Sequence, residues 1–385
     1  MTVVSQMPAV TALSPSSEAE LAEVIGSATS ALHIQGGGTR SFASVAADTV
    51  LNTGGLAGIS LYEPGALTLV AQAGTKLSDI QEALSAEGQR LAFEPADIRG
   101  LVGVEGQSTI GGVIATNASG PRRIQAGAAR DFTLGVRFVD GKGTVLKNGG
   151  RVMKNVTGYD LVKLLSGSWG SLGVLSEVSL KTQPIPETQA CVLINGLSIL
   201  EAVQVMSQAL GSPYELTGAA HAPAGVDGHP VTMLRIEGFE GSVSYRASKL
   251  AELFGTYDVS IETDPAKVSK GWQWVRDVVL LQDQSGDVWR VSCKPSDAPD
   301  LIEKSGAQQS LLDWGGGLAW LRMPAGRDLR TALGGFDGHA TLVKGEAASA
   351  NLPQFHPQPP ALATLSQALR AKFDPKGILN PGIMG

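Results

Sequence analysis

The sequence is poor in the residues that build metal centres. Only two cysteines occur among its 385 residues, Cys191 and Cys293, and there is no CxxC pair or Cys/His cluster. Iron–sulfur clusters and structural zinc sites need about four such ligands, so the ligand count excludes both. The five histidines are scattered, and a lone histidine does not hold a metal. We therefore expect no metal site in this chain.

Long apolar runs and an excess of positive charge are also lacking. No stretch approaches 18 consecutive apolar residues, and residues 1–15 lack the basic and apolar regions of a secretory signal. The net charge is −6 with no basic stripe, which argues against nucleic-acid binding. Free thiols are usual in a reducing compartment. These absences predict a cytoplasmic protein without a transmembrane segment, and leave open a peripheral attachment to the inner face of the cytoplasmic membrane through partners.

Glycine, in contrast, is abundant, with 48 residues and no period. A strand-like segment at 32–35 runs into Gly36, Gly37 and Gly38, followed by Thr39 and Arg40. Backbone without Cβ atoms approaches a bulky ligand closely, and successive amides in such a turn form a concave anion site. A flexible surface turn is the alternative interpretation of the triplet taken alone.

The glycine turn does not fit the common nucleotide fingerprints. Gly36-x-Gly38 lacks the third glycine of the Rossmann motif, and residues 39–48 show no helical period before the next strand-like run. Gly141-Lys142 lacks the preceding glycine that a P-loop requires. Both classes are therefore disfavoured.

Periodicity along the chain predicts an α+β protein. A capping box at Ser17 and Glu20 starts a helix, and a strand at 67–71 precedes a helical stripe ended by Gly88. Beyond Pro184 and Pro186 the runs 191–194, 199–210, 214–220, 231–236, 243–254 and 257–261 predict a β-α-β-β-α-β, ferredoxin-like unit. A helix from Asp264, further alternation at 288–293 and 318–323, and a helix at 361–373 follow. We expect three parts, residues 1–185, 186–350 and 351–385.

A series of motifs in the same order resembles the FAD-binding PCMH-type domain of the vanillyl-alcohol-oxidase superfamily. The motifs are FEPAD at 93–97, STIGGVIATNASGPRR at 108–123, ARDFTLG at 129–135, GGRVMKNVTGYDL at 149–161, GSWGSLGV at 167–174 and FDPKGILNPG at 373–382. They extend over about 17–183 and 360–385, and their wording is most similar to the FAD subunits of glycolate oxidase, in the branch lettered E. The resemblance implies a two-subdomain FAD-binding domain and an antiparallel α+β cap domain with ferredoxin-like units.

The resemblance also implies a set of FAD-binding residues. These are Gln35, Gly36, Gly37, Gly38, Thr39, Arg40, Pro95, Thr109, Gly111, Gly112, Asn117, Ser119, Gly120, Arg123, Val174 and Asn380. Some members of the superfamily bind the flavin covalently through a histidine beside the glycine turn. This chain has Thr39 and Arg40 there, so we expect it to bind FAD without a covalent bond.

Other charged residues have two interpretations each. Arg122 and Arg123 neutralise phosphate or a partner's carboxylates, or are solvated surface cations. For Arg130 and Asp131 we expect a buried ion pair that braces the cofactor pocket. Lys154, Tyr159 and Asp160 are expected to orient neighbouring loops, and a proton-transfer role for Tyr159 is the alternative. No catalytic residue is assigned.

The cap differs from that of relatives that oxidise hydroxy acids, where a histidine-rich segment binds a metal and the substrate. The nearest counterpart here is the segment 338–342, with one histidine. The resemblance thus implies an FAD-binding subunit of a multi-subunit glycolate oxidase, in which glycolate becomes glyoxylate. The chain would relay electrons or act as a scaffold beside a related FAD-containing subunit, where the small 2-hydroxy acid is oxidised, and an iron–sulfur subunit.

Two alternatives stay open at this point. The first is a self-sufficient FAD-dependent oxidase of another small hydroxy acid or alcohol, with Arg290, Arg322 or Lys344 binding the carboxylate. The second is a non-catalytic structural subunit whose nucleotide pocket is empty.

Overall fold

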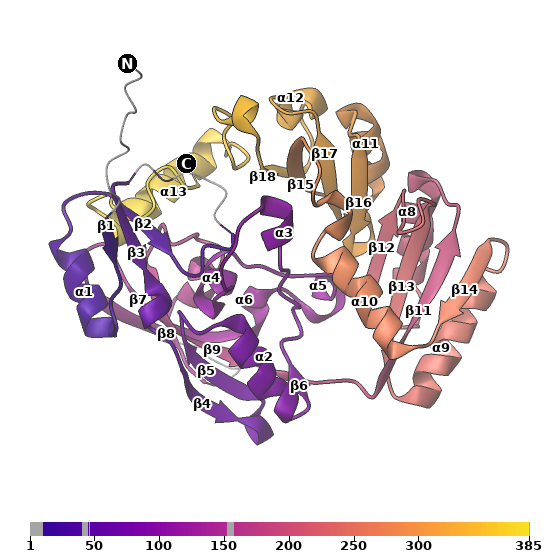
Figure 1. Cartoon of the computed structure of the whole chain (residues 1–385), viewed down its shortest axis with the longest axis horizontal. Helices are drawn as coiled ribbons and strands as arrows, with labels where there is room; N and C mark the ends of the chain where they lie inside the picture. The colour runs from indigo at the N-terminus through magenta and orange to yellow at the C-terminus, as the bar shows by residue number, and fades with distance from the viewer. Residues whose placement is uncertain (1–10, 41–44, 46, 152–157, 385) are drawn as a thin grey trace, which may run out of the picture.

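The computed structural model describes residues 11–40, 45, 47–151 and 158–384. The fold is α+β, as predicted, and its two halves lie side by side (Figure 1). One half contains the N-terminal strands and returns at the C-terminus. The other is a cap made from the middle of the chain. The motif residues 152–157, including Lys154, lie outside the described residues.

The first layer is a small parallel sheet in the order β1-β3-β2, formed by β1 (Thr11–Leu13), β2 (Leu32–Gln35) and β3 (Thr49–Asn52). Helix α1 (Glu18–Ser27) begins after Ser17, whose hydroxyl accepts a hydrogen bond from the Glu20 amide. The Glu20 carboxylate accepts hydrogen bonds from the amide and hydroxyl groups of Ser16. It does not accept one from the Ser17 amide, which a complete capping box would require. Leu21 and Ile25 of α1 are buried against this sheet.

The second layer is an antiparallel sheet in the order β4-β5-β9-β7-β8. Its strands are β4 (Ile59–Glu63), β5 (Thr68–Gln72), β7 (Thr133–Val139), β8 (Val145–Gly149) and β9 (Val174–Lys181). After α1, this half contains the helices α2 (Leu77–Ala86), α3 (Arg99–Val102), α4 (Ile110–Ala115), α5 (Arg123–Ala126), α6 (Ala129–Phe132) and α7 (Leu161–Leu165). A short ladder pairs β6 (Gln89–Arg90) with β10 (Gln183–Pro184). Between the two layers run the glycine turn and α4.

The cap is built on one eight-stranded sheet in the order β14-β11-β13-β12-β16-β17-β15-β18. Its first half contains β11 (Thr188–Asn195), α8 (Ile199–Leu210), β12 (Gly218–Ala222), β13 (Val231–Gly238), α9 (Glu240–Leu253) and β14 (Asp258–Glu262). This sequence of elements and its strand order form the expected ferredoxin-like unit.

A second β-α-β-β-α-β unit follows, which the sequence showed only as further alternation. It contains β15 (Asp287–Cys293), α11 (Ala298–Ser305), β16 (Gln309–Asp313), β17 (Leu318–Met323), α12 (Leu329–Leu333) and β18 (Gly338–Lys344). The two units join edge to edge through β12 and β16. One sheet face packs on α8, α9, α11 and α12 in the largest core cluster, and the other faces α10 (Pro265–Arg276) and the N-terminal half.

The C-terminal segment ties the last residues of the chain to the first layer. Helix α13 (Pro360–Phe373) runs back from the cap, and Leu379 forms a parallel bridge with Leu32 of β2 (Figure 1). Ile378 and Leu379 are buried with the apolar residues of α1 and β2. The N-terminal layer is therefore completed by residues from the far end of the sequence.

Candidate functional site

The glycine turn after β2 packs tightly against the segment 106–109. A Cβ on Gly37 would lie 1.5 Å from the Gln107 carbonyl oxygen, and one on Gly36 would lie 2.4 Å from Thr109 Oγ1. Gly38 has φ +68°, in the left-handed region that favours glycine. The turn thus needs glycine for contacts within the chain as well as for the approach of any ligand, a requirement that the sequence did not reveal.

Gly111 and Gly112 lie across a cavity from the glycine turn at 36–38. Thr109 caps α4 by accepting a hydrogen bond from Gly112 N, and Gly111 N donates to the Ala73 carbonyl at 2.7 Å. The glycine turn at 36–38 and the pair Gly111–Gly112 line one cavity of about 110 Å³. The backbone of residues 36–38 and of 111–112 therefore bounds the same space from two sides, as the binding of a dinucleotide between two layers would require.

Arg40 is a partly buried cation at this cavity. One guanidinium nitrogen donates to the Ala96 carbonyl at 2.5 Å, while Nε is buried and has no hydrogen-bond partner among the described residues. Burial lowers the Arg40 pKa to about 10, opposed by the charges of Asp97 and Asp277. Ser108 Oγ, next to the turn, is also buried, with no hydrogen-bond partner in the described part of the chain. Unpaired donors beside an amide-rich turn fit a diphosphate, whose oxygens are strong acceptors.

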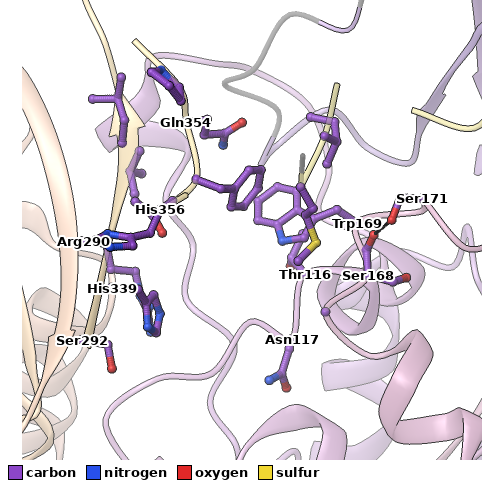
Figure 2. Close-up of a pocket in the computed structure, with 18 of the residues that line it drawn as sticks. Thr116, Asn117, Ser168, Trp169, Ser171, Arg290, Ser292, His339, Gln354 and His356 are labelled. Atoms are coloured by element: carbon purple, nitrogen blue, oxygen red, sulfur yellow. Dashed lines mark hydrogen bonds between the residues drawn. The ribbon is translucent and has the colours of Figure 1, made fainter. Parts of the chain in front are cut away.

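A cleft of about 1480 Å³ opens from the small cavity. Arg40, Thr116, Trp169 and Ile383 line both spaces, so the two are continuous. In Figure 2, Thr116, Asn117 and Trp169 face the cleft from the N-terminal half, and Arg290, Ser292 and His339 face it from the cap strands. The cleft is large enough for a ligand of cofactor size, because typical ligand pockets enclose roughly 300–1,000 Å³.

Strand alternation explains the polar wall on the cap side. Arg290 and Ser292 are two residues apart on β15, and they pair in register with Thr341 and His339 of β18. Residues at i and i+2 of a strand share a face, so all four side chains point to the cleft. Burial lowers the pKa of Arg290 to about 10 and also lowers that of His339, with nearby Arg290 as a second cause.

The structure brings most of the predicted FAD-binding residues to these two spaces. The small cavity is lined by Gln35, Gly36, Gly37, Gly38, Thr39, Arg40, Thr109, Gly111, Gly112, Val174 and Asn380. Asn117, Ser119 and Arg123 line the cleft, whereas Pro95 and Gly120 line neither space. The Asn117 side-chain oxygen accepts from Arg130 N, and Ser119 Oγ accepts from Ala129 N. These two side chains therefore order their own loop.

Two residues at the junction were missed in the sequence. Trp169 has φ +55° and lies edge-on to Phe355 from the C-terminal segment, at 5.3 Å between ring centroids. Both line the cleft. The turn motif at 167–174 contained Trp169, but no pattern in the sequence showed that its ring meets a residue 186 positions later.

The three candidate carboxylate-binding residues lie in different environments. Arg290 lines the cleft, whereas Arg322 donates hydrogen bonds to the side chains of Gln308 and Gln309, and Lys344 donates one to the Gln284 carbonyl.

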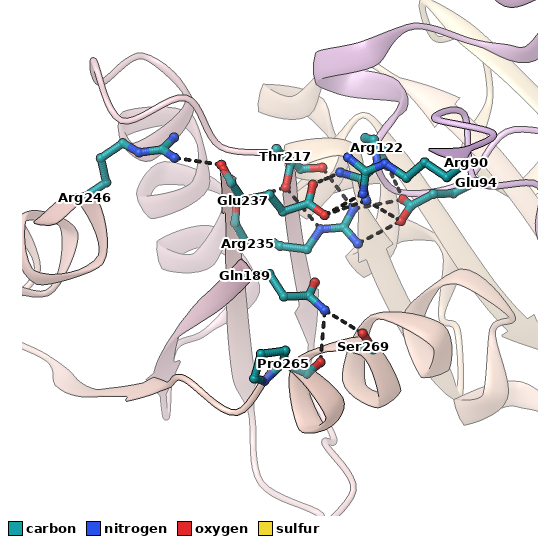
Figure 3. Close-up of polar contacts among 10 residues, drawn as sticks. All are labelled: Arg90, Glu94, Arg122, Gln189, Thr217, Arg235, Glu237, Arg246, Pro265 and Ser269. Atoms are coloured by element: carbon teal, nitrogen blue, oxygen red, sulfur yellow. Dashed lines mark hydrogen bonds and ion pairs between the residues drawn. The ribbon is translucent and has the colours of Figure 1, made fainter. Parts of the chain in front are cut away.

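Neither interpretation of Arg122 matches its environment. Arg122 is buried and pairs with Glu94 at 2.9 Å and with Glu237, so it binds carboxylates of its own chain. Arg235 also pairs with Glu94 at 2.9 Å, and Arg90 pairs with Glu237 at 2.9 Å. Figure 3 shows this five-residue cluster, which we call the interdomain ion cluster, between the N-terminal half and strand β13 of the cap. The neighbouring guanidinium groups hold the pKa of Glu94 at about 2 against the opposing effect of burial.

The prediction of a buried Arg130–Asp131 ion pair was wrong. Their side chains are 48% and 39% exposed and their closest charged atoms are 4.0 Å apart, whereas Lys163 pairs with Asp131 at 2.9 Å. The Asp131 carboxylate instead accepts hydrogen bonds from Ala128 N at the start of α6 and from Lys163 Nζ, both at 2.9 Å. Tyr159 is 89% exposed, and Asp160 caps α7 by accepting from Lys163 N.

Neither a metal cluster nor a membrane helix is found within the described ranges. No three His, Cys, Asp or Glu side chains are grouped as a metal site there. No helix in those ranges has both the length and the apolar character needed to cross a bilayer.

Comparison with known proteins agrees with this geometry. Residues 11–149 match the family described as FAD binding domain. Two structures of alkyldihydroxyacetonephosphate synthase superpose on 96% of the chain and 76% of theirs, with TM-scores of 0.70 and 0.67 at 15% and 16% identity, and so share the fold. Fold and site together define a protein with an FAD-binding domain and a cap of two ferredoxin-like units.

Sequence relatives narrow this class. The chain is 37% identical to the glycolate oxidase subunit GlcE of Escherichia coli over 329 residues, which cover 85% of this chain and 84% of that protein. It is 33% identical over 146 residues to the glycolate oxidase subunit GlcD of Bacillus subtilis, covering 38% and 30%. It is 26% identical over 356 residues to the mitochondrial D-2-hydroxyglutarate dehydrogenase of Rattus norvegicus, covering 81% and 65%. The chain belongs to the GlcE family of glycolate oxidase subunits, and with it to the FAD-dependent oxidoreductases.

Proposed function

We propose that this chain is the FAD-binding subunit of a multi-subunit glycolate oxidase, and that it binds FAD without a covalent bond. The observation that carries the proposal is the single cavity bounded by Gly36–Gly38 on one side and Gly111–Gly112 on the other, open to the cleft. Thr39 and Arg40 stand beside the turn, where covalent relatives have a histidine, which supports non-covalent binding.

The residues around the cavity have distinct roles in this proposal. The amides of residues 36–38 and the Thr39 hydroxyl would donate hydrogen bonds to the diphosphate, and the guanidinium group of Arg40 would offset its charge. The segment 116–119 and Trp169 line the cleft and would enclose the part of the cofactor that enters it. When bound, FAD supplies an acceptor for a hydride and a donor of single electrons. The interdomain ion cluster holds the cap over this space.

We further propose that the chain relays electrons or acts as a scaffold, while glycolate is oxidised to glyoxylate in a related FAD-containing subunit and electrons leave through an iron–sulfur subunit. The names of the relatives GlcE and GlcD support assembly with a related subunit. We propose a division into residues 1–185, 186–350 and 351–385. The two free cysteines support a cytoplasmic location, and the complex would attach peripherally to the membrane through its partners.

The test is the flavin content and flavin reduction of the purified chain. Acid precipitation is expected to release about one FAD per chain into the supernatant. Glycolate is expected to bleach this flavin slowly in the single chain and rapidly after the partner subunits are added. Fast bleaching in the single chain would overturn the relay role and favour the self-sufficient oxidase. A colourless preparation would favour the structural subunit.

A further inference from the structure

We propose that the cap wall of the cleft contains a binding site for a small 2-hydroxy or 2-oxo carboxylate, formed by Arg123, Arg290 and His339 around the ring of Trp314. This site belongs to the chain itself. It goes beyond the proposed function, which places the small acid in a partner subunit, and it does not require that the flavin of this chain turns over.

The two arginines lie against the same aromatic ring. Arg123 Cζ is 4.6 Å from the centroid of Trp314, and Arg290 Cζ is 5.1 Å from it and 6.0 Å from that of Trp320. One arginine comes from the N-terminal half and the other from β15 of the cap. Both side chains line the cleft, so the pair spans the boundary between the halves.

Neither guanidinium forms an ion pair or hydrogen bond with any group in the described part of the chain, in contrast to Arg122 and Arg235, which pair with carboxylates of the interdomain ion cluster. A partly buried cation without a counter-ion is unfavourable, and the face of an aromatic ring offsets this cost only in part. An anion bound between the two guanidinium groups would remove this imbalance.

The charges around Arg123 and Arg290 favour the binding of an anion from outside the chain. Burial is the main cause that lowers the pKa of both arginines, and Arg123 adds to the effect on Arg290 by repulsion. The acid whose charge acts on Arg290 is Asp313, but burial raises the pKa of Asp313 to about 7. Asp313 is therefore a weak counter-ion near neutral pH, and a carboxylate ligand with an ordinary pKa would be a stronger one.

The neighbouring groups select the class of carboxylate. His339 has a lowered pKa, so near neutral pH its imidazole is uncharged and both donates and accepts hydrogen bonds. Ser292 and Thr341 lie on the same strand face. The arginines suit the carboxylate, because guanidinium groups bind it with two parallel hydrogen bonds. The imidazole and hydroxyls suit an oxygen on the adjacent carbon.

Trp314 connects this site to the FAD-binding half. Its indole Nε1 donates to the Gly120 carbonyl at 3.0 Å, and Gly120 belongs to the segment predicted to bind the cofactor. The ring is thus fixed in place before any ligand binds. In the proposed function a different cation, Arg40 at the glycine turn, would bind the diphosphate of FAD.

The experiment is isothermal titration calorimetry of the FAD-loaded chain with glycolate, glyoxylate, acetate and inorganic phosphate. Glycolate and glyoxylate are expected to bind, acetate more weakly and phosphate weakest. R290Q and R123Q are each expected to weaken glycolate binding at least about tenfold. R290K, which keeps the charge and loses the planar fork, is expected to lie between the wild type and R290Q. R322Q is the matched control, since Arg322 lies on the same sheet but does not line the cleft, and it is expected to bind like the wild type.

Several results would overturn the proposal. These are no binding of glycolate or glyoxylate, equal binding by R290Q and the wild type, or equal binding of phosphate and glycolate. Binding that is present in the FAD-free chain and lost on FAD loading would assign the arginines to the dinucleotide instead. Flavin content, measured on the same samples, separates this test from that of the proposed function. A colourless chain that binds glycolate through Arg290 would keep the site and remove the cofactor role.

Discussion

Asn380 and Ile34 lie 346 residues apart in sequence, yet the Asn380 side-chain oxygen accepts a hydrogen bond of 2.7 Å from the Ile34 amide. The same side chain donates through Nδ2 to the Trp169 carbonyl at 2.7 Å. One amide group therefore joins the strand before the glycine turn, the turn at 167–174 and the closing segment. The arrangement fixes the cavity wall from three parts of the chain.

Removing this side chain is expected to loosen the cavity. Asn380 has φ +44°, which glycine also adopts, so N380G removes both hydrogen bonds without adding backbone strain. Leaving the Ile34 amide and the Trp169 carbonyl unpaired is expected to lower the free energy of unfolding by about 2–4 kcal/mol. Urea denaturation measures this change, and flavin content is expected to fall with it. N351G, at an exposed asparagine, is the control. Equal stability of N380G and the wild type would contradict the role of Asn380.

A methyl group at Gly37 is expected to abolish tight FAD binding. The Cβ of G37A would lie 1.5 Å from the Gln107 carbonyl, so the turn or the segment 106–109 must move. Such overpacking costs about 1–3 kcal/mol and displaces the amides that face the cavity. Fluorescence titration of the FAD-free protein is expected to show at least about tenfold weaker binding. In the control, G65A, the added Cβ meets no atom within 4 Å. Unchanged affinity in G37A would show that the turn does not position the cofactor.

The buried carboxyl group of Asp313 is expected to make stability fall as the pH rises. Burial raises its pKa in the folded protein to about 7 from the ordinary value of 3.8, while Arg235 and Arg290 oppose this and Glu94 reinforces it. Between about pH 4 and 7 the folded state thus binds more protons than the unfolded state, and its stability decreases by up to about 1.4 kcal/mol per pH unit.

Asparagine cannot ionise, so D313N is expected to lose this dependence. The stability of D313N relative to the wild type is expected to increase from pH 4 to pH 7, as measured by urea denaturation at several pH values. Contributions from other groups, including the low pKa of Glu94, cancel in that difference. D300N, at an exposed aspartate, is expected to show no such trend. A difference between D313N and the wild type that is constant with pH would exclude the shifted carboxyl group.

The interdomain ion cluster is expected to be sensitive to the loss of one charge. E237Q leaves Arg90 without its carboxylate partner and Arg122 with Glu94 alone. Removing one member of a buried pair typically costs about 3–5 kcal/mol, because the remaining charge stays buried. E215Q is the matched control, since Glu215 is 83% exposed and 3.7 Å from Arg246. If both variants unfold at the same denaturant concentration, the cluster does not hold the cap in place.

Local signals in the sequence were enough to predict many of the helices and strands. The helix predicted at 199–210 has these same bounds as α8, and Asp264 caps α10 with Pro265 in its first turn. The α+β class and the first ferredoxin-like unit are confirmed. These features depend on periodicity, capping side chains and prolines within a few residues, which a single sequence displays.

Long-range relationships were not predictable in the same way. Val279 stands at helical spacing from Val268, Trp272 and Val275, yet it is 39% exposed, because α10 ends at Arg276 and Val278 adopts φ +53°. The pairing of β12 with β16 depends on which strand edges remain free after each unit has formed. The pairing of Arg122 with Glu237 joins the two halves, and no local pattern marks either residue for the other.

The bridge between Leu32 and Leu379 has a consequence for biosynthesis. Leu32 N donates to the Ile378 carbonyl and Asn380 N donates to the Leu32 carbonyl, so β2 gains this neighbour only after residues 378–380 have been made. At about 5–20 residues per second, the ribosome needs on the order of tens of seconds to reach that neighbour. The nascent N-terminal layer must wait for it with one side uncovered. Removal of residues 378–380 would therefore leave β2, near the other end of the sequence, without these two backbone hydrogen bonds.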